Sequence, residues 1–138
     1  MIVDAKDMIV GRFATKVAKA ALEGKEVHVI NCEDAVYSGS RDKVLEKFQR
    51  SRDRTVALKG PYISRLPERI VRRAIRGMIP YKTPKGKAAF ARIKCHKGLP
   101  AEFEGQEAIR YEEASKEKLP NIQYVYVHDI SAMLGGRR

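Results

Sequence analysis

The stretch GRFATKVAKAALEGKEVHVINC, residues 11–32, places a helix pattern directly before a strand pattern. Phe13, Val17 and Ala21 recur every four residues, as on the buried side of a helix, and Gly24 follows as a stop signal. The run VHVIN, residues 27–31, is close to continuously apolar, which is typical of a strand covered on both faces. This stretch therefore indicates an α/β fold.

The same alternation extends in both directions along the chain. Residues 1–3 (MIV) precede the helix as a short strand pattern, and residues 40–51 (SRDKVLEKFQRS) follow as a second helix pattern. Strand, helix, strand and helix in succession predict parallel strands joined by right-handed crossovers. Further along, residues 92–96 (RIKCH) and 122–130 (IQYVYVHDI) are predicted strands. The prediction is thus a mainly parallel sheet.

The length of 138 residues is typical of one domain that can bury a core. We divide it into an α/β core at residues 1–98 and a more variable C-terminal extension at 99–138. The extension is acidic near its start and interrupted by Pro and Gly. No apolar run is long enough to span a membrane, and the acidic start MIVDAKD is no signal peptide. We therefore expect a cytoplasmic protein.

Positive charge is concentrated in the middle of the chain. The net charge is +11, and 15 of the 28 Lys and Arg lie between Arg50 and Lys97, with only two of the 17 acids. An even distribution for solubility would not produce this, so residues 50–97 predict a cationic face for an anionic partner. Nucleic acid is favoured over a membrane, because the apolar residues here suit a core and no aromatic anchors accompany them.

Residues 67–78 (PERIVRRAIRGM) predict an amphipathic helix with Pro67 in its first turn. At 100° per residue its cations fall within an arc of about 100°, and the apolar residues occupy the opposite side. Gly77 and Pro80 end the helix, and Thr83 caps the next one. The cationic side comprises Arg65, Arg69, Arg72, Arg73 and Arg76, and the apolar side comprises Ile70, Val71, Ala74, Ile75 and Met78.

The sequence offers little for other kinds of chemistry. Cys32 and Cys95 have no neighbouring cysteine, so we expect both to be reduced and buried, and the three histidines form no spaced ligand set. We therefore predict no metal and no cofactor. With no Trp and few aromatics, a broad base-stacking platform is not expected. The guanidinium group of arginine can bind a phosphate through two hydrogen bonds at once. A protein that recognises the shape of a folded RNA in this way does not need to read its bases.

Four stretches of the sequence stand out as motifs: DAKDMIVGRFATKVAK near the start, VINCEDAVYSG over the second strand and its turn, GPYISRLPERI, and RGMIPYKTPKGKAAFARIKCHKGLP. Together these motifs resemble the universal L-thirteen family of large-subunit ribosomal proteins. The resemblance covers residues 1–100 and is closer to the archaeal and eukaryotic branch than to the bacterial one.

The resemblance implies a three-layer α/β/α domain with about four strands that binds large-subunit rRNA and has no catalytic residue. It also implies neighbouring ribosomal proteins as partners, with no small-molecule substrate. Gly77 and Pro80 match family positions that set the geometry of the loop, and we add Gly86 as a third residue of this kind. The predicted rRNA-binding residues are Arg12, Arg50, Arg52, Arg54, Lys59, Arg65, Arg69, Arg72, Arg73, Arg76, Lys82, Lys85, Lys87, Arg92, Lys94 and Lys97.

Two other readings of the sequence remain open. The turn YSGSR, residues 37–41, could cradle a phosphate in a nucleotide-binding or RNA-modifying enzyme, but one Gly and Ser40 as N-cap also suit a plain strand-to-helix turn. A free regulator that binds messenger RNA would share the same cationic face. Cellular location, not sequence, separates that regulator from a ribosomal protein.

Overall fold

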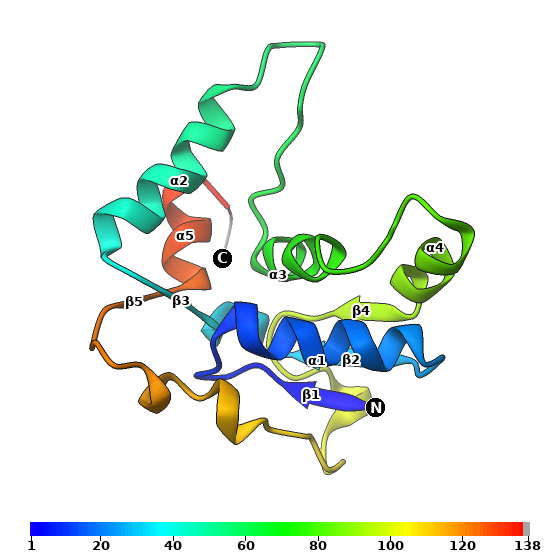
Figure 1. Cartoon of the computed structure of the whole chain (residues 1–138). Coiled ribbons are helices and arrows are strands. Elements are labelled where there is room, and N and C mark those ends of the chain that lie inside the picture. Colours follow the sequence, from blue (N-terminus) through cyan, green and yellow to red (C-terminus); the bar gives the residue numbers. More distant parts are fainter. Residues whose placement is uncertain (137–138) are drawn as a thin grey trace.

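The computed structural model describes residues 1–136 and shows a parallel sheet of the predicted kind (Figure 1). Its strands are β1 (Ile2–Asp4), β2 (Val27–Ile30) and β4 (Ile93–Cys95), in the order β1-β2-β4. Helix α1 (Val10–Leu22) connects β1 to β2, and both neighbouring pairs are parallel. The α/β class predicted from the sequence is confirmed.

Within residues 1–136 the parallel sheet has three strands, where about four were expected. The C-terminal part of the chain extends the β1 edge by a single residue, because the Ile109 amide donates to the Ile2 carbonyl (2.8 Å) and the Asp4 amide donates to the Ile109 carbonyl (3.1 Å). Strand β3 (Val36–Ser38), the next strand along the chain after β2, does not join this sheet. It pairs with β5 (Tyr124–Tyr126) in a separate antiparallel ladder.

The late strand predicted for residues 122–130 is wrong in its second half. Strand β5 ends at Tyr126, and helix α5 (Val127–Met133) follows at once. Val127, Ile130 and Leu134 lie three and four residues apart and are all fully buried. Only a helix places that spacing on one side, and α5 packs this side against α3 (Pro67–Arg76).

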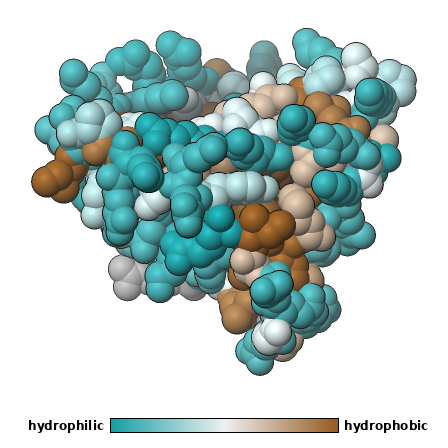
Figure 2. Space-filling model, turned by 60° about the horizontal axis from the view of Figure 1, so that its bottom comes forward, coloured by the Kyte–Doolittle hydropathy of each residue, from teal (hydrophilic) through white to brown (hydrophobic). Residues whose placement is uncertain are grey.

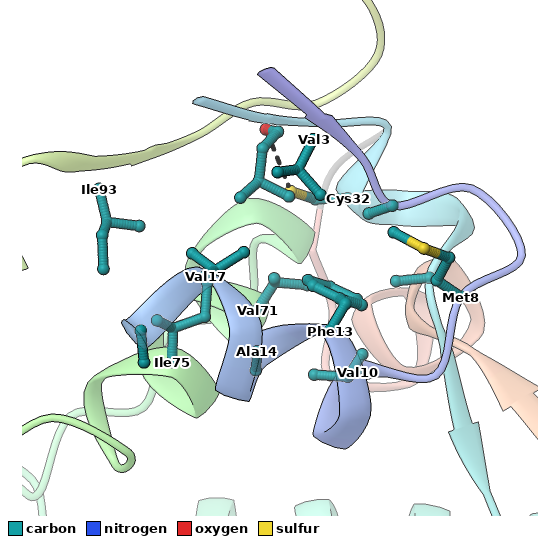
Figure 3. Close-up of a cluster of buried hydrophobic side chains, with 14 of the residues drawn as sticks. Val3, Met8, Val10, Phe13, Ala14, Val17, Cys32, Val71, Ile75 and Ile93 are labelled. Carbon is teal, nitrogen blue, oxygen red and sulfur yellow. Dashed lines mark hydrogen bonds between the residues drawn. The ribbon is translucent and has the colours of Figure 1, made fainter. Parts of the chain in front are cut away.

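The core lies between the sheet and the helices on one of its faces. Side chains of α1 and α3 gather there with Val3 of β1 and Ile93 of β4 (Figure 3). Phe13 at the centre and Ile75 of α3 are both fully buried. The four-residue repeat that predicted α1 therefore marks its core side.

The other face of the sheet is covered by the segment after β4 and not by a long helix. His28 of β2 lies 3.2 Å from His96 between ring nitrogens, and the Phe103 ring packs on His28 at 4.7 Å between centroids. Phe103 belongs to a 3₁₀ turn, η2 (Ala101–Phe103), one of several in this segment (η1, Cys32–Asp34; η3, Glu112–Ala114; η4, Lys116–Lys118). Figure 2, seen from this side, shows mostly hydrophilic residues with small hydrophobic patches.

The predicted extension at residues 99–138 takes part in the core, since Val125, Val127 and Leu134 are buried with the rest. Arg137 and Arg138 lie outside the described residues. Both cysteines are free: Cys32 is buried as expected, whereas Cys95 is only partly covered because it ends β4 at the sheet edge.

No helix in the described chain is long and apolar enough to cross a membrane.

Helix α2 (Arg41–Asp53) has no fully buried residue along its described length and packs on α5 and β5. Residues 54–66 then form an extended arm that returns to α3 (Figure 1). At its tip Leu58 is 95% exposed, and Tyr62 is 73% exposed. The arm carries Arg54, Lys59 and Arg65 of the predicted cations, all exposed.

Candidate nucleic-acid interface

Helix α3 has the two sides that its sequence predicts. Pro67 occupies the first turn, Gly77 caps the C-terminus, and Ile70, Val71 and Ile75 are buried. Arg69 and Arg73 are exposed on the other side. Two details differ from the prediction. Arg65 precedes the N-cap Leu66 and is not helical, and Met78 lies beyond the helix end, where it is 39% exposed while Ile79 enters the core.

Arg72 and Arg76 are half-buried because they bind parts of the fold itself. Arg72 Nε donates to the Ile93 carbonyl at 3.2 Å, and its guanidinium stacks 4.3 Å from the Phe90 ring centroid. The Arg76 guanidinium lies 4.9 Å from the Tyr81 ring centroid. These two arginines therefore hold β4, α4 (Pro84–Ala91) and the connecting loop against α3.

Helix α4 begins as predicted. Pro84 is in its first turn, and the Thr83 hydroxyl accepts a hydrogen bond from the Gly86 amide at 3.1 Å. The same hydroxyl donates to the Pro80 carbonyl at 2.8 Å, which ties the loop to the helix start. Because Thr83 already binds the Gly86 amide, that N–H is not free for a phosphate. The cations Lys82, Lys85 and Lys87 surround this start and are exposed.

The three residues predicted for loop geometry differ in their surroundings. Pro80 supplies the carbonyl that Thr83 binds. Gly86 is buried, and a Cβ on it would overlap the backbone carbonyl of Pro80. Gly77 has ordinary helical backbone angles, with a φ of −63°, and a Cβ there would meet its nearest atom at 3.5 Å. The close approach of loop and helix thus requires glycine at position 86.

Gly86→Ala is expected to destabilise the protein by roughly 1–3 kcal/mol, since either the loop or α4 must move to relieve the overlap. Gly77→Ala is the matched control and should be neutral or stabilising, because glycine is the poorer residue in helical conformation. Urea denaturation of both variants measures this difference. Equal midpoints for the two would show that the loop does not approach α4 as described.

The remaining predicted cations do not gather on this surface. Arg12 at the start of α1 donates to the Glu113 carbonyl (3.1 Å), and Arg92 donates to the Ala21 carbonyl (3.1 Å). Lys94 lies on the opposite face of the sheet and pairs with Glu26 at 2.8 Å. The structure also places Arg50 beside Glu46, Arg52 beside Asp53, and Lys97 near Glu33 and His128.

Several exposed cations have no carboxylate partner within residues 1–136, among them Arg54, Lys59 and Arg65 of the arm. Five others stand on α3, the following loop and α4, and we call them together the basic surface: Arg69, Arg73, Lys82, Lys85 and Lys87. The single acid of α3, Glu68, has a buried carboxylate oxygen with no hydrogen-bond partner in the described chain, and it pairs with none of these cations. An unpaired positive surface of this kind suits a polyanion.

A groove lies beside this surface, between α2 and α3, and the sequence did not predict it. Its volume is about 330 Å³. Its walls combine Arg69 and Arg73 with Lys47 from α2, a cation outside the predicted segment 50–97. The apolar and hydroxyl lining comes from Tyr37, Phe48, Ser51, Ile63, Ser64, Ile70 and Ala74. The groove exists because α2 packs on α5 and β5, which no local pattern reveals.

Residues 37–41, which could cradle a phosphate by their sequence, span the turn between strand β3 and helix α2 in the structure. Gly39 has a φ of 124°, and its amide donates to the Gln123 carbonyl at 3.0 Å, next to the β3–β5 ladder. Ser40 is the N-cap residue of α2, as expected, although its side chain makes no capping bond. In the described part of the chain no cluster of His, Cys, Asp and Glu could hold a metal ion.

Comparison with known proteins supports the resemblance noted in the sequence. The family model described as Ribosomal protein L13 matches residues 1–102, about three quarters of the chain. The chain belongs to the ribosomal protein L13 family. The basic surface falls inside the matched range, as do both walls of the groove.

Three archaeal relatives match nearly the whole chain. Each is named large ribosomal subunit protein uL13. The protein of Methanococcoides burtonii is 40% identical over 136 residues, covering 99% of this chain and 98% of its own. Those of Natronomonas pharaonis and Archaeoglobus fulgidus are 40% and 39% identical, covering 98% and 99% of this chain and 90% and 88% of their own. The similarity therefore includes the segment after residue 102.

Proposed function

We propose that this chain is a structural constituent of the large ribosomal subunit that binds large-subunit rRNA through the basic surface. The observation that carries the proposal is the set of exposed Arg69, Arg73, Lys82, Lys85 and Lys87, which have no carboxylate partner in residues 1–136. The names of its family relatives agree with this role. Its place is the cytoplasmic ribosome, among neighbouring large-subunit proteins, and it has no catalytic role.

The physical basis of binding is charge neutralisation of the RNA backbone. Guanidinium groups bind phosphate oxygens in pairs, and each neutralised phosphate releases condensed counterions to the solvent. The cations stand on a helix and at a capped helix start, so the backbone that carries them is fixed in place. Such contacts recognise the shape of a folded RNA without reading base edges.

Binding to folded large-subunit rRNA is expected to depend strongly on salt. If about six phosphates are neutralised, log K should fall with log salt at a slope of roughly −4 to −5, at about 0.7 to 0.9 per phosphate. A filter-binding titration from low to high salt measures the slope. A slope near zero would contradict the electrostatic account.

The cellular role is tested by sedimentation of lysate from the source cells, probed for this protein. Co-migration with large subunits after a high-salt wash supports the ribosomal role. A pool that stays entirely in the soluble fraction contradicts it and favours a free RNA-binding regulator.

A further inference from the structure

The groove between α2 and α3 has charged rims and an apolar interior. Arg69 and Arg73 lie one helical turn apart on its α3 wall, and Lys47 stands on the α2 wall. None of the eleven residues that line it, all of them described in the structure, is Asp or Glu. The groove therefore attracts an anion from both sides while its interior favours an apolar group.

The interior carries an aromatic surface that is already fixed in orientation. The Phe48 ring meets the Tyr37 ring edge-on, with centroids 5.3 Å apart and planes inclined by 73°. This is a preferred arrangement of two aromatic rings, so Phe48 presents its ring without further ordering. Both side chains pack against the hydrophobic core from the outside.

Hydrogen-bonding groups also reach the groove. The Tyr37 hydroxyl has no hydrogen-bond partner among residues 1–136, although its ring is largely covered, and burial raises the pKa of Tyr37 to about 12. It therefore stays protonated at neutral pH and can donate as well as accept. Ser51 and Ser64 also line the groove; the Ser51 hydroxyl donates to the Lys47 carbonyl at 3.1 Å, and the Ser64 hydroxyl accepts from the Leu66 amide at 3.5 Å. Both oxygens keep a lone pair that can accept a further hydrogen bond.

These features discriminate between possible occupants. An aliphatic side chain of a neighbouring protein would fill the interior but leave Lys47, Arg69 and Arg73 without a counter-charge. An unstacked nucleotide uses both parts of the groove, since its base is flat and apolar on its faces and polar at its edge, and its phosphates are anionic.

We propose that the groove binds one unstacked nucleotide of the rRNA. Its base packs against Phe48, the base edge meets the Tyr37 hydroxyl, and the flanking phosphates lie against Arg69, Arg73 and Lys47. This inference rests on the proposed rRNA binding and adds a base-binding pocket to a surface that otherwise contacts only the backbone.

The test compares Phe48→Leu with wild type in binding to transcribed large-subunit rRNA of Archaeoglobus fulgidus, with the salt dependence measured for each. Loss of one base–aromatic stack should weaken binding roughly 5- to 100-fold. The salt slope should stay as in wild type, because no phosphate contact is removed. Phe103→Leu, a partly covered aromatic on the far face of the sheet, is the matched control and should bind normally.

A second variant tests the groove independently, in case Phe48→Leu misfolds. Ala74→Leu fills the groove from α3 without deleting a contact, and it should weaken binding similarly while a thermal melt shows that the protein is still folded. Ultraviolet cross-linking of wild type to the same RNA should attach a nucleotide to the peptide that contains Tyr37 or Phe48.

The possible results separate this inference from the proposed function. If wild type binds with the steep salt slope but both groove variants bind equally well, the pocket is refuted and rRNA binding stands. If those variants bind RNA normally but fail to enter large subunits, a protein occupies the groove and the inference is wrong. If wild type shows no salt-dependent binding, the proposed function fails, and the pocket fails with it.

Discussion

Replacing both Arg69 and Arg73 with alanine is expected to weaken rRNA binding by roughly 100- to 10,000-fold and to leave the fold intact. Each charge-assisted contact with a phosphate contributes about 1.5–3 kcal/mol, and two such contacts are lost. Both side chains are exposed and have no ion pair within residues 1–136, so the free energy of unfolding should change by no more than about 0.5 kcal/mol per site.

A filter-binding titration next to a thermal melt measures both effects. Lys19→Ala combined with Lys118→Ala removes the same charge from exposed sites outside the basic surface and serves as the control. If this control loses as much affinity as the arginine double variant, binding depends on net charge alone and the assignment to α3 is wrong. Arg72 is unsuitable for the test, since its contacts with Ile93 and Phe90 belong to the fold.

Ile75→Ala should have the opposite pattern, with a large loss of stability and little loss of affinity. Ile75 is fully buried between α3 and the sheet, and truncating such a side chain leaves a cavity that costs about 2–5 kcal/mol. The fraction that remains folded should bind rRNA almost as well as wild type, because the basic surface is unchanged.

Denaturant unfolding followed by an RNA titration on the folded fraction tests this. Ile122→Ala is the control, as that side chain is 93% exposed and its removal should change the midpoint little. An Ile75 variant that unfolds with the Ile122 control would mean that the two sides of α3 are assigned the wrong way round.

The α3 assignments show how far a local pattern can be trusted. The repeat of apolar residues predicted which side is buried, because side chains three and four apart share a helix face whatever the surroundings. It did not separate exposed Arg69 and Arg73 from Arg72 and Arg76, which are partly covered. That difference depends on Tyr81 in the following loop, Phe90 of α4 and Ile93 of β4, which fold back against α3.

The sequence by itself determined the elements whose causes are local. The spacing in α1, Pro67 and Pro84 at helix starts, and the Thr83 cap all act within a turn or two of chain. The excess of cations between Arg50 and Lys97 is visible in the composition alone. They were enough to predict an α/β fold and a polyanionic partner. The family motifs added the ribosomal assignment.

Only the tertiary structure decided which distant segments meet. Residues 122–130 contain both a strand and a helix pattern, and the division at Tyr126 follows from pairing with β3 and from packing of α5 on α3. The groove arises in the same way, since Lys47 and Phe48 face Arg69 and Arg73 only after α2 has packed on α5. Contacts between residues far apart in the chain depend on the whole folded arrangement, and no periodicity in the sequence encodes them.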